Sequence, residues 1–301
     1  ALVIGAALWP NWCAYPGLFA SLVTGNPVLV KPHPQAILPL ALTVEAIRAA
    51  MAAAGLPPDV VQLCVDTKEA PVARTLARSP TVKLIDYAGG PNFVRWLKTH
   101  APQARITTET RGLNPVVVDS TDDFDGLCRQ LAYALTLHSG QTRTAPQNIF
   151  VPLDGIATEA GRRSPDEVAA GIAHAIDDFV VGDEAAAIVG AVPDQETIDA
   201  VRRCQALGRI LRDAAPVPIA EHPKARTLSP LLLATEAGRD EVYEIVRPGP
   251  VALVVTTFDT AESIERAAHG AAKQGAVAAI VHSTNDHVLE AAADALVGAG
   301  V

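Results

Sequence analysis

Residues 27–54, PVLVKPHPQAILPLALTVEAIRAAMAAA, carry the clearest sign of how this chain folds. A short run rich in β-branched residues, Pro27–Lys31, precedes a long alanine-rich stretch of helical period at residues 36–54. The alternation recurs along the chain: we expect strands at residues 1–5, 27–31, 60–65, 83–87, 115–119, 148–152, 187–192, 229–235, 251–258 and 277–283, and helices near residues 13–24, 36–54, 68–78, 91–100 and 123–138. Strands that alternate with helices predict an α/β fold with a largely parallel sheet.

The composition excludes several classes of protein. With 301 residues, 49% of them hydrophobic and 19% charged, the chain suits a packed globular protein of about two domains. Its net charge of −9 and its scattered lysines and arginines predict no nucleic-acid partner, because a polyanion would be repelled. Cys13, Cys64, Cys128 and Cys204 are too widely spaced for a disulfide framework or a zinc site, so we predict no metal and a reducing, cytoplasmic setting.

The first 30 residues carry no charge, a feature of signal peptides and membrane spans. Pro10 and Pro16 interrupt this run and no basic segment precedes it, so we predict neither. Because the chain begins inside an expected strand and without methionine, we expect it to be a segment of a longer protein. The polar stretch at residues 101–112 is the expected division into two domains, and residues 153–166 are expected to form an exposed connection.

Two strand ends carry residues that suit a nucleotide. Lys31 ends a buried strand, and because ligands of open α/β sheets bind at the carboxyl ends of strands, its cation suits a ribose hydroxyl or a phosphate. In YAGGP, Gly89 and Gly90 let the backbone approach an anion, and Pro91 opens a helix whose first N–H groups favour negative charge. Each motif also suits a plain structural role, as a surface lysine and as a turn.

Glu109 precedes a glycine turn and a strand in TETRGLNPVVV. A carboxylate that is partly removed from water has a pKa nearer to neutrality and can act as a general base. An exposed loop glutamate is the simpler alternative.

Taken together and in this order, these segments resemble the aldehyde dehydrogenase superfamily, and the resemblance covers essentially all 301 residues. The stretch WPNWCAYPG resembles the family's PWNFP-type loop and places the oxyanion-binding asparagine at Asn11. Lys31 in GNPVLVKPHP matches the lysine that contacts the adenosine ribose. The acidic residue that follows three positions later in many members is Pro34 here, so the resemblance implies NAD or NADP without choosing between them.

Three further motifs of the family have counterparts. Residues 87–90, YAGG, resemble the FTGS turn beneath the cofactor phosphates, which implies cofactor contacts at Gly89 and Gly90. The stretch ETRGLNP resembles the ELGG(K)xP signature and implies Glu109 as the general base. The stretch EIVRPGPV resembles EIFGPV, with two extra residues, and implies that Glu244 holds the nicotinamide ribose.

The family's nucleophile is missing. Its GQxC motif, whose thiolate attacks the aldehyde, is matched by GQTR, so Arg143 stands where the cysteine is expected. The interval from Glu109 to Arg143 equals the family's usual interval between base and cysteine. A guanidinium stays protonated and has no lone pair for attack, so it can only polarise or bind an anion. Cys13, close to Asn11, is interpreted as a buried apolar cysteine and not as a replacement.

Three functions stay open. As an enzyme the protein would oxidise an aldehyde to an acid with NAD(P)+, in a cleft between its domains, with Glu109 as base. Asn11 and a backbone N–H near Arg143 would bind the oxyanion. Alternatively the protein is a catalytically silent homologue that binds the nucleotide, or a cofactor-independent thioester hydrolase that uses Glu109 and water.

Within the superfamily, PGLFASLVTGNPVLVKPHP and GQTRTAPQNIFVP look most like the phenylacetic acid degradation branch, which resembles ring-opening dehydrogenases of CoA-linked aromatic aldehydes. The resemblance implies an α/β, aldehyde-dehydrogenase-like fold. A Rossmann-type nucleotide-binding domain at residues 1–110 would join an α/β catalytic domain at residues 111–301, both truncated. It also implies a small-molecule aldehyde as substrate, free or CoA-linked, and a homo-oligomer of the full-length protein, with neither nucleic acid nor membrane as a partner.

Overall fold

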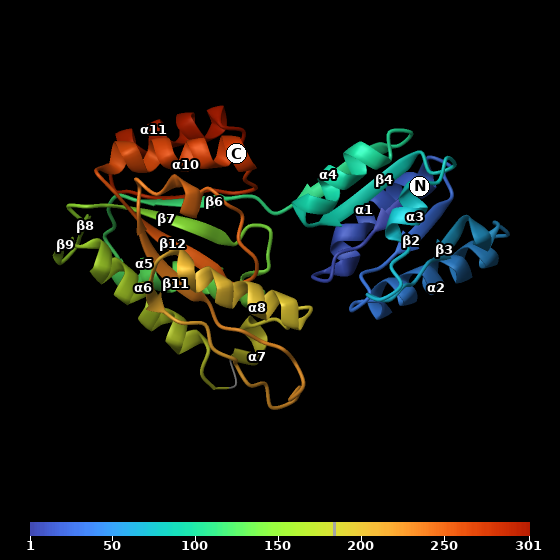
Figure 1. The fold of residues 1–301 in the computed structure, drawn as a ribbon, viewed down its shortest axis with the longest axis horizontal. Coiled ribbons are helices and arrows are strands. Elements are labelled where there is room, and N and C mark those ends of the chain that lie inside the picture. Colours follow the sequence, from blue (N-terminus) through green and yellow to red (C-terminus); the bar gives the residue numbers. More distant parts are fainter. Residues whose placement is uncertain (183–184) are drawn as a thin grey trace. The chain divides into compact units, whose positions relative to one another are not determined.

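The computed structural model describes residues 1–182 and 185–301, which form two compact units, Ala1–Thr110 and Arg111–Val301. Each unit has a β-sheet at its centre and helices on both faces of that sheet (Figure 1). The predicted α/β fold is therefore confirmed. Crossing a bilayer takes about 20 apolar residues in one helix, and no helix within the described residues meets that requirement.

The first unit contains a five-stranded sheet, entirely parallel, in the order β3-β2-β1-β4-β5. Its elements are β1 (Leu2–Ile4), α1 (Pro10–Val23), β2 (Val28–Lys31), α2 (Leu38–Ala53), η1 (Pro58–Val60), β3 (Val61–Leu63), α3 (Ala73–Ala77), β4 (Leu84–Gly89), α4 (Pro91–His100) and β5 (Arg105–Thr110). Parallel strands need crossover connections, and helices α1 to α4 supply them. The strands expected at residues 27–31, 60–65 and 83–87 are confirmed.

Both faces of this sheet are buried, because alternate residues of a strand point to opposite faces. In β1, Leu2 and Ile4 pack in one core with residues of α3 and α4. Val3 packs in a second core with residues of α1 and α2. Burial on both sides explains why these strands are continuous apolar runs in the sequence.

The strand order places the carboxyl ends of β1 and β4 side by side at a reversal in the course of the chain. The chain proceeds from β1 through β2 to β3 on one side, and then continues with β4 and β5 on the other. In open α/β sheets, ligands bind outside the carboxyl ends of the strands at such a reversal. The fold of the first unit therefore points to the loops after Ile4 and Gly89 as a binding site.

The second unit contains a six-stranded sheet in the order β10-β11-β12-β7-β6-β13, parallel except for β10 at one edge. Its described elements are β6 (Asn114–Val118), α5 (Phe124–Thr136), η2 (Leu137–Gly140), β7 (Pro146–Pro152), β8 (Ile156–Thr158), β9 (Gly161–Arg163), α6 (Pro165–Phe179), α7 (Ala185–Ile188), α8 (Gln195–Arg203), η3 (Cys204–Leu207), β10 (Arg209–Arg212), β11 (Leu231–Glu236), α9 (Asp240–Tyr243), β12 (Val251–Thr257), α10 (Thr260–Gln274), β13 (Ile280–His282) and α11 (Asp286–Gly298).

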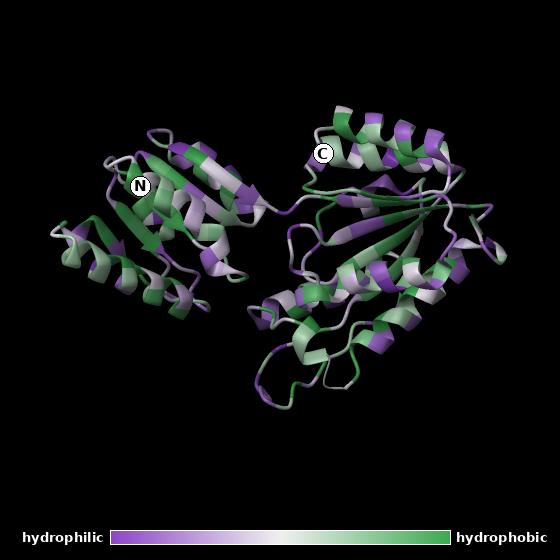
Figure 2. Cartoon of the chain, turned by 180° about the vertical axis from the view of Figure 1, so that it is seen from behind, coloured by the Kyte–Doolittle hydropathy of each residue, from purple (hydrophilic) through white to green (hydrophobic). Residues whose placement is uncertain are grey.

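Helices cover both faces of this second sheet as well. Val116 and Val118 of β6 pack in a core with α5 and α6, and Val117 packs in another with α10 and α11. Figure 2 shows the central strands mostly in hydrophobic colours and the helices alternating between hydrophobic and hydrophilic residues. The helices thus turn one face to the sheet and the other to solvent.

Three expectations about local structure differ from what is observed. The strand expected at residues 187–192 is wrong, since this apolar run begins inside helix α7, and a short run of that kind does not separate helix from strand by pattern alone. The polar stretch at residues 101–112 contains the edge strand β5. The connection expected at residues 153–166 contains the hairpin of β8 and β9.

Candidate functional site

The first unit brings three of the predicted site residues to one edge of its sheet. Lys31 is the last residue of β2, and Gly89 is the last residue of β4. In register, Ile4 of β1 lies beside Lys31 on one side and beside Tyr87 of β4 on the other. Strand β5 pairs with β4 along its whole length and carries Glu109 near its own carboxyl end. All three residues therefore lie at the edge where the strand reversal predicts a ligand.

The turn after β4 has the features of an anion-binding cradle. Gly90 is the N-cap of α4, and no side chain caps this helix, whose first residue is Pro91. A β-carbon at Gly90 would meet no atom within 4 Å, so no other part of the protein fills the space beside this residue at the start of the helix. A β-carbon at Gly89 would collide with Tyr87, whose hydroxyl donates to the carbonyl oxygen of Gly90 at 3.2 Å. Free N–H groups and the positive end of the helix dipole fit the phosphates of a dinucleotide.

Lys31 takes part in a buried ion pair. Its Nζ lies 2.6 Å from Oδ1 of Asp66, and the two side chains are 6% and 1% exposed. The other carboxylate oxygen of Asp66 accepts a hydrogen bond from the backbone N–H of Val72 at 3.0 Å. Asp66 is not among the site residues predicted from the sequence, although its place just after β3, at the same edge of the sheet, is a signal that could have found it.

Glu109 lies near a second acid, Asp86 of β4. Burial and the charge of Glu109 raise the pKa of Asp86 from its ordinary value of 3.8 to about 6. The carboxylate of Asp86 lies against Gly17 of α1, where any side chain would collide with it. The surroundings of the predicted base thus contain an acid that titrates close to neutral pH.

Asn11 lies in the first turn of α1, after the carboxyl end of β1. It lines a hollow of about 480 Å³ together with Trp9, Pro10, Trp12 and Pro39, so the hollow is apolar except for this amide. The residue before the helix, Trp9, has a φ of 46°, a left-handed conformation that is uncommon for a side chain of this size. Strained backbone of this kind clusters at ligand-binding sites. The arrangement suits an apolar molecule that carries a hydrogen-bonding group.

In the second unit, Arg143 lies in the loop between η2 and β7. The turn that leads to it is strained at His138 and Ser139, which have positive φ angles of 51° and 53°. Gly140 follows with a φ of 58°, which glycine adopts freely. Nδ2 of Asn114 donates to the carbonyl oxygen of Arg143 at 2.5 Å and holds the loop from the start of β6. The loop is therefore fixed although it carries no thiol.

Arg111 ties the Arg143 loop to the segment that follows Glu244. It donates hydrogen bonds to the carbonyl oxygens of Gly140, Arg247 and Gly249. Burial lowers the pKa of Arg111 to about 10, which leaves its guanidinium charged at neutral pH. The two segments with family motifs in this unit are thus held together by one buried cation.

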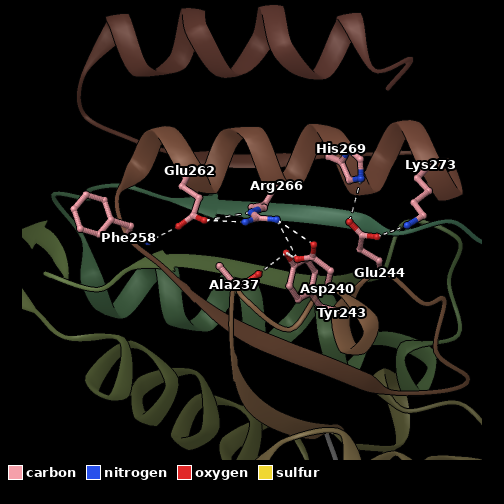
Figure 3. A network of polar contacts seen from close by, with 9 residues as sticks. All are labelled: Ala237, Asp240, Tyr243, Glu244, Phe258, Glu262, Arg266, His269 and Lys273. Carbon is pink, nitrogen blue, oxygen red and sulfur yellow. Dashed lines mark hydrogen bonds and ion pairs between the residues drawn. The ribbon is translucent and has the colours of Figure 1, made fainter.

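Glu244 follows α9 and turns its carboxylate toward α10 (Figure 3). One carboxylate oxygen lies 2.5 Å from Nζ of Lys273, and the other lies 3.3 Å from Nε2 of His269. The side chain is only 7% exposed. A ribose at this position would share the carboxylate with Lys273 and His269, neither of which is among the site residues predicted from the sequence.

The two cysteines of the second unit, Cys128 in α5 and Cys204 in η3, lie outside the Arg143 loop. Burial raises the pKa of Cys128 to about 12 and also raises the pKa of Cys204, so both stay protonated at neutral pH. Cys13 is half-buried in α1, and its Sγ lies 3.8 Å from the carbonyl oxygen of Leu8. Within the described residues there is also no group of three or more side chains that could hold a metal ion.

These features define a class: an α/β protein with a Rossmann-like parallel sheet, a glycine cradle at its carboxyl edge, and a second, mixed sheet. The sequence profile of the Aldehyde dehydrogenase family matches residues 10–301. The chain belongs to this family, and the predicted membership of the superfamily is confirmed.

Among solved structures, the NAD-dependent aldehyde dehydrogenase from Burkholderia multivorans is 41% identical, with a TM-score of 0.95, and the match covers 100% of this chain and 54% of that one. The NADP-dependent glyceraldehyde-3-phosphate dehydrogenase from Bacillus halodurans is 22% identical, with a TM-score of 0.76, over 98% of this chain and 58% of that one. The second likeness shows the fold alone. The chain thus spans little more than half the length of these enzymes.

Curated relatives match a shorter stretch. The N-succinylglutamate 5-semialdehyde dehydrogenase of Pseudomonas fluorescens is 27% identical over 153 residues, which are 50% of this chain and 30% of that protein. The bifunctional aldehyde-alcohol dehydrogenase AdhE of Escherichia coli is 27% identical over 131 residues, which are 44% of this chain and 14% of that protein. The chain spans less than a third of the length of these two relatives in the matched stretches.

Proposed function

We propose that this chain binds NAD or NADP at the carboxyl edge of its five-stranded sheet. The observation that carries this proposal is the open turn at Gly89 and Gly90, which leads into the uncapped helix α4 at the strand reversal. In this assignment the two glycines receive the phosphates and Lys31 the adenosine ribose. From the resemblance of its own motif alone, we propose separately that Glu244 of the second unit binds a nicotinamide ribose. When bound, the cofactor accepts a hydride from the substrate. The likeness to the NAD-dependent Burkholderia enzyme supports the assignment.

We assign the hollow beside Asn11 to an aldehyde. Two indoles and two proline rings offer an apolar wall, and the side-chain amide of Asn11 can donate a hydrogen bond to a carbonyl oxygen. An aromatic aldehyde, free or CoA-linked, fits such a wall, in keeping with the resemblance to the phenylacetic acid degradation branch. We further propose a cytoplasmic, homo-oligomeric full-length protein, a location supported by four free thiols.

We propose that the chain as it stands binds these molecules without oxidising the aldehyde. The covalent route needs a thiolate that adds to the carbonyl carbon, and then a base, here Glu109, that activates water to cleave the resulting thioester. Arg143 has no lone pair for the first step, and the two buried thiols with raised pKa values do not supply one. A dehydrogenase that oxidises aldehydes is the second candidate function, favoured by the intact loop that Asn114 and Arg111 hold.

Calorimetric titration of the chain with NAD and with NADP tests the binding proposal. We expect saturable binding of at least one dinucleotide. A parallel assay with aromatic aldehydes should show no aldehyde-dependent formation of NAD(P)H. If neither dinucleotide binds, the assignment of a cofactor site to the sheet edge is wrong. If the chain reduces the cofactor when an aldehyde is added, the proposal that it does not oxidise aldehydes is wrong.

A further inference from the structure

The ion pair between Lys31 and Asp66 lies where the proposed function places the adenosine ribose. Lys31 ends β2, and its carbonyl oxygen accepts a hydrogen bond from the N–H of Gly5, just after β1, at 2.9 Å. Asp66 comes from the loop after the neighbouring strand β3. The pair is therefore part of the carboxyl edge of the sheet and not of its interior.

The pair leaves this edge without a net positive charge. Asp66 is held in place by two contacts, the ammonium of Lys31 at 2.6 Å and the N–H of Val72 at 3.0 Å. The ammonium and the carboxylate are opposite formal charges in direct contact, so the two charges cancel. Beyond the pair, the segments 31–35 and 66–69 carry one lysine, Lys68, and one glutamate, Glu69, whose charges also cancel, and one histidine, His33, which adds nothing to the formal charge at pH 7.

NAD and NADP differ at this place by one phosphate. NADP carries an extra phosphate on the 2′ oxygen of the adenosine ribose, whereas NAD has a free hydroxyl there. A 2′-phosphate is accommodated by an uncompensated cation, while a 2′-hydroxyl is accepted where an acid is present. A lysine already neutralised by a buried aspartate can donate a hydrogen bond to a hydroxyl, but it offers little attraction to a dianion.

We propose that Asp66 is the positioning residue that makes this chain select NAD over NADP, by holding Lys31 and cancelling its charge. This inference rests on the proposed function. Pro34 cannot fill the acidic role, and the proposal assigns that role to Asp66, 32 positions further along the chain in the loop after β3. The selection follows from the charge at the sheet edge.

Equilibrium binding by calorimetry, which needs no turnover, tests the proposal. We expect the unmodified chain to bind NAD at least about tenfold more tightly than NADP, and Asp66→Asn to shrink this ratio at least about tenfold by releasing the charge of Lys31. If Asp66 had only a structural role, Asp66→Asn would weaken the binding of NAD and of NADP alike and leave the ratio of the two affinities unchanged. Asp59→Asn is the matched control, since Asp59 pairs with Arg48 at 2.8 Å in the same unit but is 78% exposed.

The outcomes separate this inference from the proposed function. If neither dinucleotide binds the unmodified chain, the proposed function fails. If both bind and NADP is bound as tightly as NAD, the inference is overturned even where Asp66→Asn does not fold. If Asp66→Asn folds, as circular dichroism and thermal unfolding would show, and keeps the original ratio, the inference is also overturned. Competition by adenosine 2′,5′-bisphosphate against adenosine 5′-monophosphate should show the same preference at the adenosine end alone.

Discussion

Asn114 fastens the carbonyl oxygen of Arg143 to a distant part of the second unit. Its Nδ2 donates to the carbonyl oxygens of Arg143 and Ala145, at 2.5 and 3.0 Å. Its Oδ1 accepts from the N–H groups of Val277 and Ala278, at 2.9 and 3.2 Å. One buried amide thus joins the loop at the family's nucleophile position to the segment before β13.

Removing this amide should destabilise the second unit. Asn114→Ala leaves two buried carbonyl oxygens and two N–H groups without their partner, so we expect the free energy of unfolding to fall by about 2–4 kcal/mol. Denaturant unfolding followed by circular dichroism measures this. Asn285→Ala is the control, since Asn285 makes a single capping bond at the surface, to His287, and should cost about 1 kcal/mol. Equal losses in the two variants would contradict the role given to Asn114.

A negative charge at the start of α4 should weaken dinucleotide binding. Gly90→Asp places a carboxylate in front of the helix where a β-carbon meets no atom within 4 Å, so the fold should tolerate it. We expect the dissociation constant to rise at least about tenfold, because the new charge repels the phosphates. Gly238→Asp, at another glycine with open space around its β-carbon, should leave binding unchanged. If Gly90→Asp binds the dinucleotide as tightly as the unmodified chain does, the phosphates do not bind at this turn.

Asp86, the acid beside Glu109, should make the stability of the folded protein depend on pH in a specific way. Because the pKa of Asp86 rises from 3.8 to about 6 on folding, the folded state binds more protons between these values, and its stability falls as the pH rises through them. Asp86→Asn cannot ionise, so its stability relative to the unmodified protein should increase between about pH 4 and pH 6 and then level off. Chemical unfolding at several pH values measures this difference. A difference in stability that does not change with pH would contradict the raised pKa of Asp86.

In the first unit, the parallel core and the edge strand β3 could be predicted from the sequence, and the polar edge strand β5 could not. Strands such as Val28–Lys31 are buried on both faces and therefore form continuous apolar runs that stand out in a sequence. Strand β5 lies at the edge of the sheet and is mostly polar, as RITTET shows, so it lacks that signal. Strand β10 (Arg209–Arg212), an antiparallel edge, was missed for the same reason.

The candidate site shows a similar contrast. Local motifs were enough to predict Lys31, Gly89 and Glu109 as site residues, because a turn or a strand end is formed by residues that are neighbours in the sequence. Their partners are not local. Asp66 contacts Lys31 from the loop after another strand, β3, and Arg111 contacts the carbonyl oxygen of Gly249 across 138 positions of the chain. Only the folded structure reveals such contacts, since no spacing in the sequence encodes them.

Restoring the thiol at position 143 tests the central claim most directly. The chain and its Arg143→Cys variant are mixed with NAD and an aromatic aldehyde, and the formation of NADH is followed. We expect no aldehyde-dependent NADH from the unmodified chain and a rate at least about 10³-fold above that background from Arg143→Cys, because only the thiolate can form the covalent intermediate. Aldehyde-dependent NADH from the unmodified chain, or a variant that binds NAD normally and still forms none, would contradict the account.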